Sequence, residues 1–163
     1  MRSCDKLMRK AFKYLLTFIA IFSADRITKW LAVKYLRYND ITVFSNLDLS
    51  FTWNRGVTWG LFGRSGNIGF YLLSALVAVV IIFFGIYTFV QHREGETVFF
   101  ELFVLSGAIS NFFDRIYYGA VVDFIDFHVL GWHWPAFNIA DACIVIGVGG
   151  IVLRGLLCAF RKK

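Results

Sequence analysis

Five aspartates lie where a carboxylate could do chemistry: Asp25, Asp114, Asp123, Asp126 and Asp141. They fall at or near the ends of strongly apolar stretches, where an ionisable group is costly and is a functional candidate. Two carboxylates that converge on one water cannot both ionise easily, so they share a proton. The ionised carboxylate can then activate the water as a base while the protonated one polarises a carbonyl group. A pair of these aspartates could therefore hydrolyse an amide without a metal or a covalent intermediate.

Asp123 and Asp141 form one candidate pair. Asp123 lies in "GAVVDFID", a loop or short strand, and Asp126 offers the same chemistry three residues later. Asp141 lies in "NIAD", where Asn138 could cap a helix and Asp141 would be the third helical residue, an acid that complements the helix dipole. Capping alone would account for Asp141, and the spacing does not distinguish Asp123 from Asp126.

The remaining acids have simpler interpretations. Asp25 and Lys29 are four residues apart with the acid first, which is the favourable order for an ion pair within a helix. Asn111 and Asp114 are three residues apart near the end of another apolar stretch, and Arg115 follows at once. Ion pairing and hydrogen bonds at helix ends would explain these five residues without any catalysis.

A metal site is the main competing chemistry. His128 and His133 lie close in sequence to Asp123 and Asp126, but their spacing on a loop is weak evidence for metal ligands. The sequence has no HExxH motif and no GxSxG nucleophile elbow, and its three cysteines have no metal-binding spacing. We therefore predict neither a metal nor a cofactor.

The elements that must position these residues are membrane spans. Of the 163 residues, 58% are hydrophobic, and Ile68–Val90 carries no charge. At about 1.5 Å per residue, such a helix crosses a hydrocarbon core of roughly 30 Å. We predict an all-α integral membrane fold with a single domain over residues 1–163. Its four spans are expected at residues 12–32, 68–90, 98–114 and 138–160.

Two local patterns refine this fold. Small residues in the third span (Ser106, Gly107 and Ser110) would let another helix approach closely. Residues 37–62 predict a small β-sheet outside the membrane, because Leu47–Asn54 alternates strictly between apolar and polar residues, with Trp53 on the apolar face. The preceding "DITVF" could be the hairpin partner of this strand.

Charged and aromatic residues predict the orientation. Ten of the 17 lysines and arginines fall on the side of the two termini, which favours both termini in the cytoplasm. The net charge of +6 indicates anchoring to anionic lipid. It does not indicate nucleic-acid binding, because no basic stripe lies on a folded soluble module. The aromatic residues Tyr117, Tyr118, Trp132 and Trp134 suit the opposite membrane interface.

Five motifs together resemble one known family, the bacterial lipoprotein signal peptidase, or signal peptidase II. In chain order they are "DRITK" (25–29), "NRGVTWG" (54–60), "GAISNFFDR" (107–115), "VVDFID" (121–126) and "PAFNIAD" (135–141). The departures are few. Val57 and Thr58 stand where the family usually has two alanines, Ser110 where it usually has glycine, and Trp134 where phenylalanine is common.

The resemblance implies a multi-pass aspartyl peptidase of the bacterial inner membrane, with its active site near the periplasmic face. It would remove the signal peptide from prolipoproteins, cleaving before the cysteine that bears diacylglyceryl, and act as a monomer among membrane lipids. The implied catalytic pair is Asp123 and Asp141, which separates Asp123 from Asp126. The residues that would bind substrate or shape the site are Asp25, Lys29, Asn54, Gly56, Asn111, Asp114, Arg115 and Asn138.

Two other classes of function fit the residues alone. A small transporter, or a proton or cation relay, would use the same acids, but such acids usually lie near the midplane of the membrane. A non-enzymatic membrane scaffold would use the aspartates only as helix caps and ion-pair partners. Inactivity of Asp123→Asn and Asp141→Asn against a prolipoprotein would separate the peptidase from both.

Overall fold

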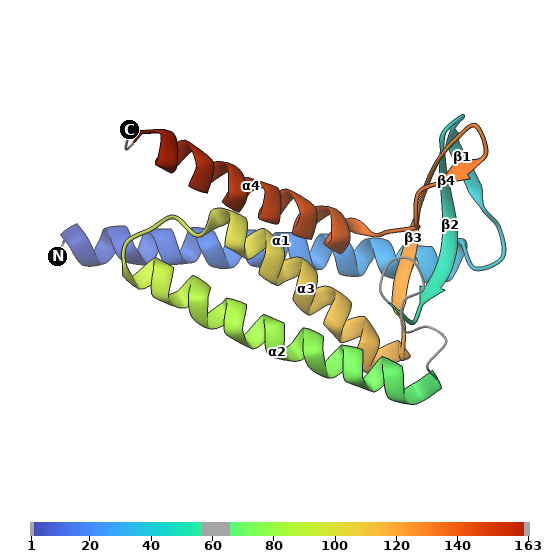
Figure 1. Ribbon diagram of the computed structural model, residues 1–163, viewed down its shortest axis with the longest axis horizontal. Coiled ribbons are helices and arrows are strands. Elements are labelled where there is room, and N and C mark those ends of the chain that lie inside the picture. Colours follow the sequence, from blue (N-terminus) through green and yellow to red (C-terminus); the bar gives the residue numbers. More distant parts are fainter. Residues whose placement is uncertain (1, 57–65, 162–163) are drawn as a thin grey trace.

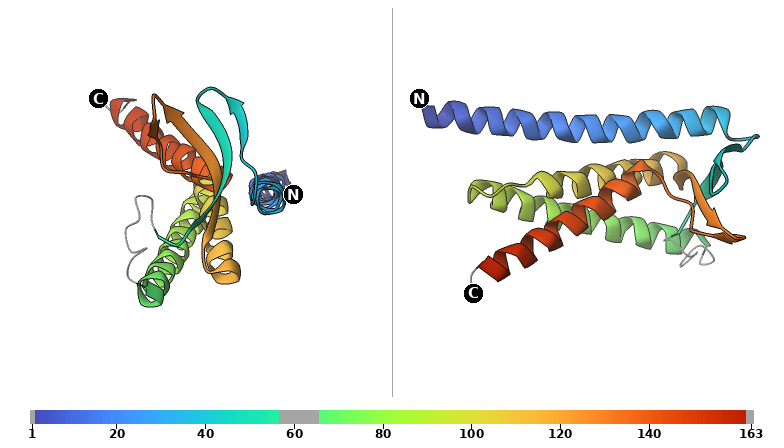
Figure 2. Two further views of the ribbon diagram at one scale, coloured as in Figure 1. Left: turned by 90° about the vertical axis from the view of Figure 1, so that its right-hand side faces the viewer. Right: turned by 90° about the horizontal axis from the view of Figure 1, so that it is seen from above.

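A computed structural model describes residues 2–56 and 66–161, which form four long helices and a small antiparallel sheet (Figure 1). The sheet lies across one end of the helices, and both chain ends lie at the other (Figures 1 and 2). The helix α3 packs against each of the other three. The elements are α1 (Arg2–Tyr35), β1 (Ile41–Phe44), β2 (Leu47–Asn54), α2 (Gly66–Arg93), α3 (Phe99–Tyr118), β3 (Val121–Val129), β4 (Trp132–His133) and α4 (Ile139–Arg161).

The helices agree with the predicted spans in position, and most of them are longer than predicted. Two segments of the described chain, Ile68–Arg93 and Ile139–Arg161, are long and apolar enough to cross a membrane. Their apolar side chains point mostly outward, as those of Leu72 and Phe83 do. Apolar surface of this extent marks contact with lipid or another partner. The helices α1 and α3 are more polar, because they carry the charged residues described below.

Small residues bring α3 and α4 into close contact, as predicted for the third span. A Cβ atom on Gly107 would lie 2.4 Å from the backbone oxygen of Ala140. On α4, a Cβ atom on Gly147 would lie 2.7 Å from the backbone oxygen of Phe100. Neither position could hold a larger residue without moving a backbone. The first turn of α4 is therefore fixed against α3, and this turn contains Asp141.

The sheet confirms the predicted strand and its hairpin, with one difference. Its order is β1-β2-β3-β4, and all pairs are antiparallel. On β2, Leu49 and Phe51 pack on a core formed by α1 and β3. The ring of Trp53 packs against that of Phe51 with centroids 4.9 Å apart, but Trp53 is 38% exposed. The register of the pairing with β3 shifts between Leu49 and Thr52.

At the end of the molecule opposite the sheet, a buried acid is neutralised across two helices. Glu101 of α3 is fully buried and forms an ion pair with Arg154 of α4. Arg154 also donates to the backbone oxygen of Thr97. These contacts join α3 and α4 far from the sheet.

Candidate active site

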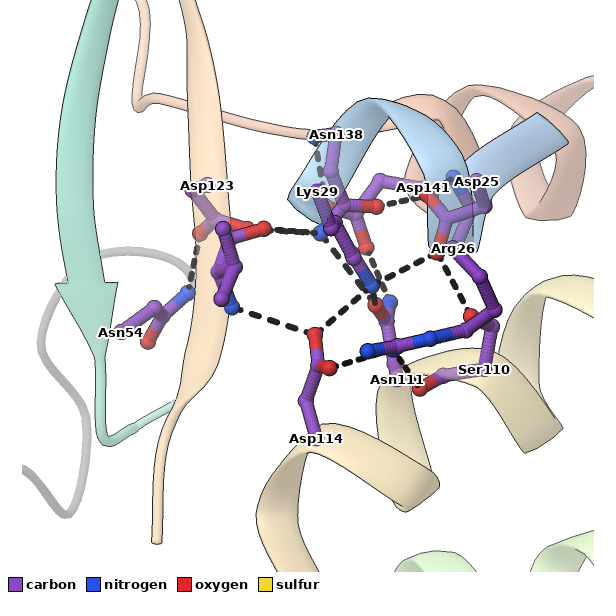
Figure 3. A network of polar contacts seen from close by, with 12 residues as sticks. Asp25, Arg26, Lys29, Asn54, Ser110, Asn111, Asp114, Asp123, Asn138 and Asp141 are labelled. Atoms are coloured by element: carbon purple, nitrogen blue, oxygen red, sulfur yellow. Dashed lines mark hydrogen bonds and ion pairs between the residues drawn. The ribbon is translucent and has the colours of Figure 1, made fainter. Parts of the chain in front are cut away.

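Two side-chain amides hold Asp123, which lies on β3 and is 1% exposed. Asn54, at the end of the neighbouring β2, donates from Nδ2 to Asp123 Oδ2 at 2.9 Å. Asn138, just before α4, donates from Nδ2 to Asp123 Oδ1 at 2.7 Å (Figure 3). Upstream, Gly119 ends α3 with a φ of 67°, a left-handed conformation that glycine adopts without strain. The turn it makes leads the chain directly into β3.

Asp141 lies in the first turn of α4 as part of a capping box. Asn138 Oδ1 accepts the backbone N–H of Asp141 at 2.9 Å, and Asp141 Oδ2 accepts the backbone N–H of Asn138 at 3.2 Å. The predicted N-cap is confirmed. The other oxygen, Oδ1, accepts a hydrogen bond from Asn111 Nδ2 at 2.8 Å. Asp141 therefore caps its helix with one oxygen and turns the other toward Asn111 on α3.

Asn138 and Asn111 join the two aspartates into one site. The amide nitrogen of Asn138 donates to the carboxylate of Asp123, and its amide oxygen accepts the backbone N–H of Asp141. Asn111 Oδ1 accepts hydrogen bonds from Lys29 Nζ at 2.6 Å and from Asn138 Nδ2 at 3.2 Å. Because that oxygen is an acceptor, the Nδ2 group of Asn111 is the one that faces Asp141. Carboxylates from a strand and from a helix thus meet around two asparagines.

The charge of this site is not balanced by ion pairs. Among the described residues, neither Asp123 nor Asp141 forms a salt bridge. Burial and, after it, the negative charge of Asp141 raise the pKa of Asp123 from 3.8 to about 7. The amides of Asn54 and Asn138 and the charge of Lys29 only partly offset this rise. Near neutral pH, the Asp123 carboxyl is therefore poised between its protonated and ionised forms.

A second group of buried acids lies beside this site and is fully paired. The group, here called the ion-pair clamp, consists of Asp25, Arg26 and Lys29 of α1 with Asp114 of α3. Lys29 Nζ lies 2.8 Å from Asp25 Oδ2 and 2.9 Å from Asp114 Oδ2, and Arg26 pairs with Asp114 Oδ1 (Figure 3). Ser110 also donates its hydroxyl to Asp25 Oδ2 at 2.6 Å. Two carboxylates therefore face two cations.

The ion-pair clamp also holds the backbone next to each aspartate of the site. Asp25 Oδ1 accepts the N–H of Ala140 at 2.8 Å, and Ala140 directly precedes Asp141. Asp114 Oδ2 accepts the N–H of Val122 at 3.2 Å, and Val122 directly precedes Asp123. The clamp thus fixes both backbones on which the two carboxylates are mounted.

Gly56 and Arg115 form the border of the site near the end of β2. Asn54 Oδ1 accepts the N–H of Gly56 at 3.0 Å, and the oxygen of Gly56 accepts from Arg115 Nη2 at 3.1 Å. Arg115 Nη1 is buried and has no partner among the described residues. Residues 57–60 of the "NRGVTWG" motif lie outside the described part of the chain, so the departures at Val57 and Thr58 have no structural account.

A cavity of about 610 Å³ opens from the site along the helices. At its polar end it is bordered by Asn54, Gly56, Asn111, Arg115 and Asp141. The rest of its lining is apolar and comes from α2, α3 and α4, including Leu73, Leu76, Val80, Phe84, Val104 and Val148. We call it the helix cavity. A long apolar segment could lie in it with one end at Asp141.

Comparison with known proteins identifies the family. The signal peptidase (SPase) II family matches residues 17–157. The chain belongs to the signal peptidase II family. The lipoprotein signal peptidase of Anaplasma phagocytophilum (strain HZ) is 36% identical over 144 residues, covering 86% of this chain and 90% of its own length. That of Thermodesulfovibrio yellowstonii (strain ATCC 51303 / DSM 11347 / YP87) is 35% identical over 148 residues, covering 90% and 97%.

A solved structure supports the membrane assignment. It is described as "Bacterial membrane enzyme structure by the in meso method at 2.3 A resolution" and matches with a TM-score of 0.71 at 26% identity. The match covers 93% of this chain and 92% of that chain. As a member of the signal peptidase II family, the chain is an integral membrane peptide hydrolase, and its family acts on prolipoproteins.

The structure distinguishes Asp126 from Asp123 by their contacts, which spacing alone could not do. Asp126 contacts His133 Nδ1 at 3.0 Å, and His128 Nε2 contacts Asp48 at 3.1 Å. The two imidazole rings stack with centroids 5.0 Å apart. Among the described residues, no group of three or more histidines, cysteines or acids is arranged to hold a metal ion.

The sequence analysis missed Arg26 and the hydroxyl of Ser110 as parts of the clamp. Arg26 pairs with Asp114 and packs over the ring of Phe113 at 4.8 Å. A charged residue inside an apolar span was the available signal, since such a residue needs a partner. Spacing could not name the partner, because Arg26 and Asp114 lie on different helices.

Proposed function

We propose that this signal peptidase II removes the signal peptide from diacylglyceryl-modified prolipoproteins, cleaving before the lipidated cysteine with Asp123 and Asp141 as its catalytic pair. The observation that carries the proposal is the bridging position of Asn138. Its side-chain amide donates to Asp123 Oδ1 and its backbone N–H donates to Asp141 Oδ2, so the two carboxylates share one site although they come from a strand and a helix. That site lies at the polar end of the helix cavity.

The hydrolysis needs one ionised and one protonated carboxyl. The ionised carboxylate takes a proton from a water, whose oxygen bonds to the carbonyl carbon before the cysteine. The protonated carboxyl gives its proton to the carbonyl oxygen, which forms a tetrahedral diol. This diol collapses as the C–N bond breaks, and the cysteine nitrogen takes up a proton. One water is consumed, and the products are a carboxylate on the signal peptide and an amine on the lipidated cysteine.

The neighbouring polar residues have supporting roles in this proposal. Asn54, Asn111 and Asn138 orient the two carboxylates, and no proton can be lost from these amides at neutral pH. Arg115, beside Gly56 at the cavity border, has a guanidinium N–H free among the described residues to bind a substrate carbonyl. Asp25, Lys29 and Asp114 act through the backbone they hold, so they are positioning residues.

The membrane arrangement is part of the same proposal. We propose one membrane-embedded peptidase domain of four spans that acts as a monomer in the bacterial inner membrane, with both termini in the cytoplasm. The sheet then lies on the periplasmic side, where exposed Trp132 and Trp134 suit the interface. The catalytic pair lies at this end of the helices rather than midway along them, which favours a peptidase over an ion relay.

The test uses three aspartate-to-asparagine variants of the full chain in detergent or lipid. Asp123→Asn and Asp141→Asn should each lower cleavage of a diacylglyceryl-modified prolipoprotein by at least about 100-fold, the low end of acid–base contributions. The matched control is Asp126→Asn, on the same strand as Asp123, which should retain wild-type cleavage. Thermal unfolding of each variant shows that it is folded. Normal cleavage by either of the first two variants would refute the catalytic pair.

A further inference from the structure

We propose that the acyl chains of the substrate's diacylglyceryl group lie in a second cavity, on the opposite side of Asp141 from the helix cavity. This inference rests on the proposed function. It assigns the two halves of the substrate to two separate cavities and names the residues that select for the lipid.

The second cavity, here called the acyl cavity, has a volume of about 510 Å³. One wall is the segment Trp134–Phe137, and the other is the face of α4 that includes Ala142 and Val145. Asp141 and Ile144, one helical turn apart, line both this cavity and the helix cavity. These two residues form a ridge between the cavities, and a catalytic carboxylate lies on it.

Both cavities are largely apolar, and they differ in the polar side chains that each offers to the substrate. A signal peptide brings backbone amides to the scissile bond, and these need hydrogen-bonding partners when they leave water. The helix cavity supplies such groups from Asn54, Asn111 and Arg115. Of the described residues that line the acyl cavity, Asp141 alone is charged, and nearly all the others are apolar. Acyl chains carry no donors and suit this lining.

The position of the lipidated cysteine leads to the same assignment. The cysteine directly follows the scissile bond, so its thioether must lie beside the catalytic pair. From there the acyl cavity begins at Asp141, and Val145 on its rim is 71% exposed, so the chains can extend into the surrounding lipid. The wall opposite α4 is firmly placed, because Phe137 exchanges backbone hydrogen bonds of 3.1 and 2.9 Å with Ile125 of the strand that carries Asp123.

The expected contribution of the acyl cavity is to orientation more than to affinity. Lipid tails are as apolar as the lining, so moving an acyl chain from the bilayer into the cavity gains little from the hydrophobic effect. What the cavity can do is fix the direction in which the thioether leaves the scissile bond. A substrate without long acyl chains should therefore be cut less efficiently. Its rate of cleavage should not change when the residues that line the acyl cavity are substituted.

The first experiment narrows the acyl cavity without touching the polar residues of the site. Val145→Trp fills its rim, and Val152→Trp makes the same change two turns further along α4, at a residue that is 55% exposed. Two forms of one prolipoprotein are compared, with dipalmitoylglyceryl or diacetylglyceryl on the cysteine. Val145→Trp should lower kcat/KM about tenfold for the dipalmitoyl form, a typical overpacking cost of ~1.4 kcal/mol. The diacetyl form should be cut as by wild type, and Val152→Trp should change neither.

Equal losses on both substrates, or no loss on either, would overturn the assignment. A second experiment locates the chains directly, with a diazirine near the end of the palmitoyl chains and the Asp123→Asn variant as a trap. Crosslinks should fall on Trp134–Phe137 and Ile144–Ile146, whereas crosslinks on Leu73–Phe84 of α2 would overturn the proposal. If Asp123→Asn still cleaves the probe, the proposed function fails. If it does not cleave and the crosslinks fall on α2, only the place of the acyl chains is wrong.

Discussion

The protein places two pairs of aspartates side by side and surrounds them with different partners. Asp25 and Asp114 are fully buried, and each is paired with a cation in the ion-pair clamp. Asp123 is equally buried, yet it and Asp141 are held by asparagine amides and backbone N–H groups. Amides can orient a carboxylate but cannot cancel its charge. The charge of the first pair is therefore neutralised by cations, and the charge of the second pair is not.

This difference suits the first pair to holding the backbone in place and the second pair to acid–base chemistry. The clamp holds the backbones of Ala140 and Val122, one residue before each carboxylate of the other pair. A carboxylate that is neutralised by a buried cation is a reliable acceptor for such a backbone N–H. Asp123 has no cation partner, and its pKa is raised to about 7, near the working pH that suits a general acid or base. Each pair would perform the other's role badly.

Removing the shared cation should have the largest effect on stability. Lys29→Met leaves Asp114 paired with Arg26 and removes the cation that pairs with Asp25. Breaking a buried pair in this way costs about 3–5 kcal/mol of the free energy of unfolding. Thermal unfolding in detergent measures the loss, and Lys34→Met, at an exposed position on the same helix, serves as the control. If the Lys29 and Lys34 variants unfold at the same temperature, the clamp does not stabilise the fold.

The pH dependence of stability should reveal the raised pKa of Asp123. Its pKa is raised from 3.8 to about 7, so between these values the folded protein holds a proton that the unfolded chain releases. The free energy of unfolding therefore falls as the pH rises from about 4 to about 7, by at most ~4 kcal/mol from this group. In Asp123→Asn this part of the slope should be absent. Unfolding temperatures at pH 5 and pH 8 measure it, and an unchanged slope would contradict the raised pKa.

Much of this architecture follows from the sequence, because it depends on contacts along one element. The N-cap at Asn138, the Asp25–Lys29 pair and the β1–β2 hairpin were all predicted from short spacings, and the structure confirms them. What could not be predicted depends on contacts between elements. Asp123 and Asp126 differ only in what the fold brings to them: two amides for Asp123, and His133 for Asp126.

Two substitutions should separate the role of Asn138 as the N-cap of α4 from its role as a hydrogen-bond donor to Asp123. Asn138→Ser keeps an oxygen that can cap α4, whereas Asn138→Ala does not, so only the alanine variant should lose the additional ~1 kcal/mol of a lost N-cap. Both variants lose the donor to Asp123 Oδ1, so both should lower kcat to a similar degree. Measurements of the unfolding temperature and of kcat for both variants distinguish the two roles. Full activity in Asn138→Ser would show that the amide bridge to Asp123 is not needed.

The smallest effects are expected where aspartates meet histidines at the outer end of the sheet. His133 is largely exposed, and exposed pairs such as His133–Asp126 contribute about 0–1 kcal/mol. His133→Ala should therefore change the unfolding temperature little and leave cleavage unchanged, with or without a chelator such as 1,10-phenanthroline. Loss of activity in the variant, or on adding the chelator to wild type, would place a metal at these histidines. It would also mean that catalysis does not depend on the difference between the aspartates paired with cations and those without a cation. Because His133 contacts Asp126, and Asp123 is held by Asn54 and Asn138 instead, we expect cleavage to be indifferent to both treatments.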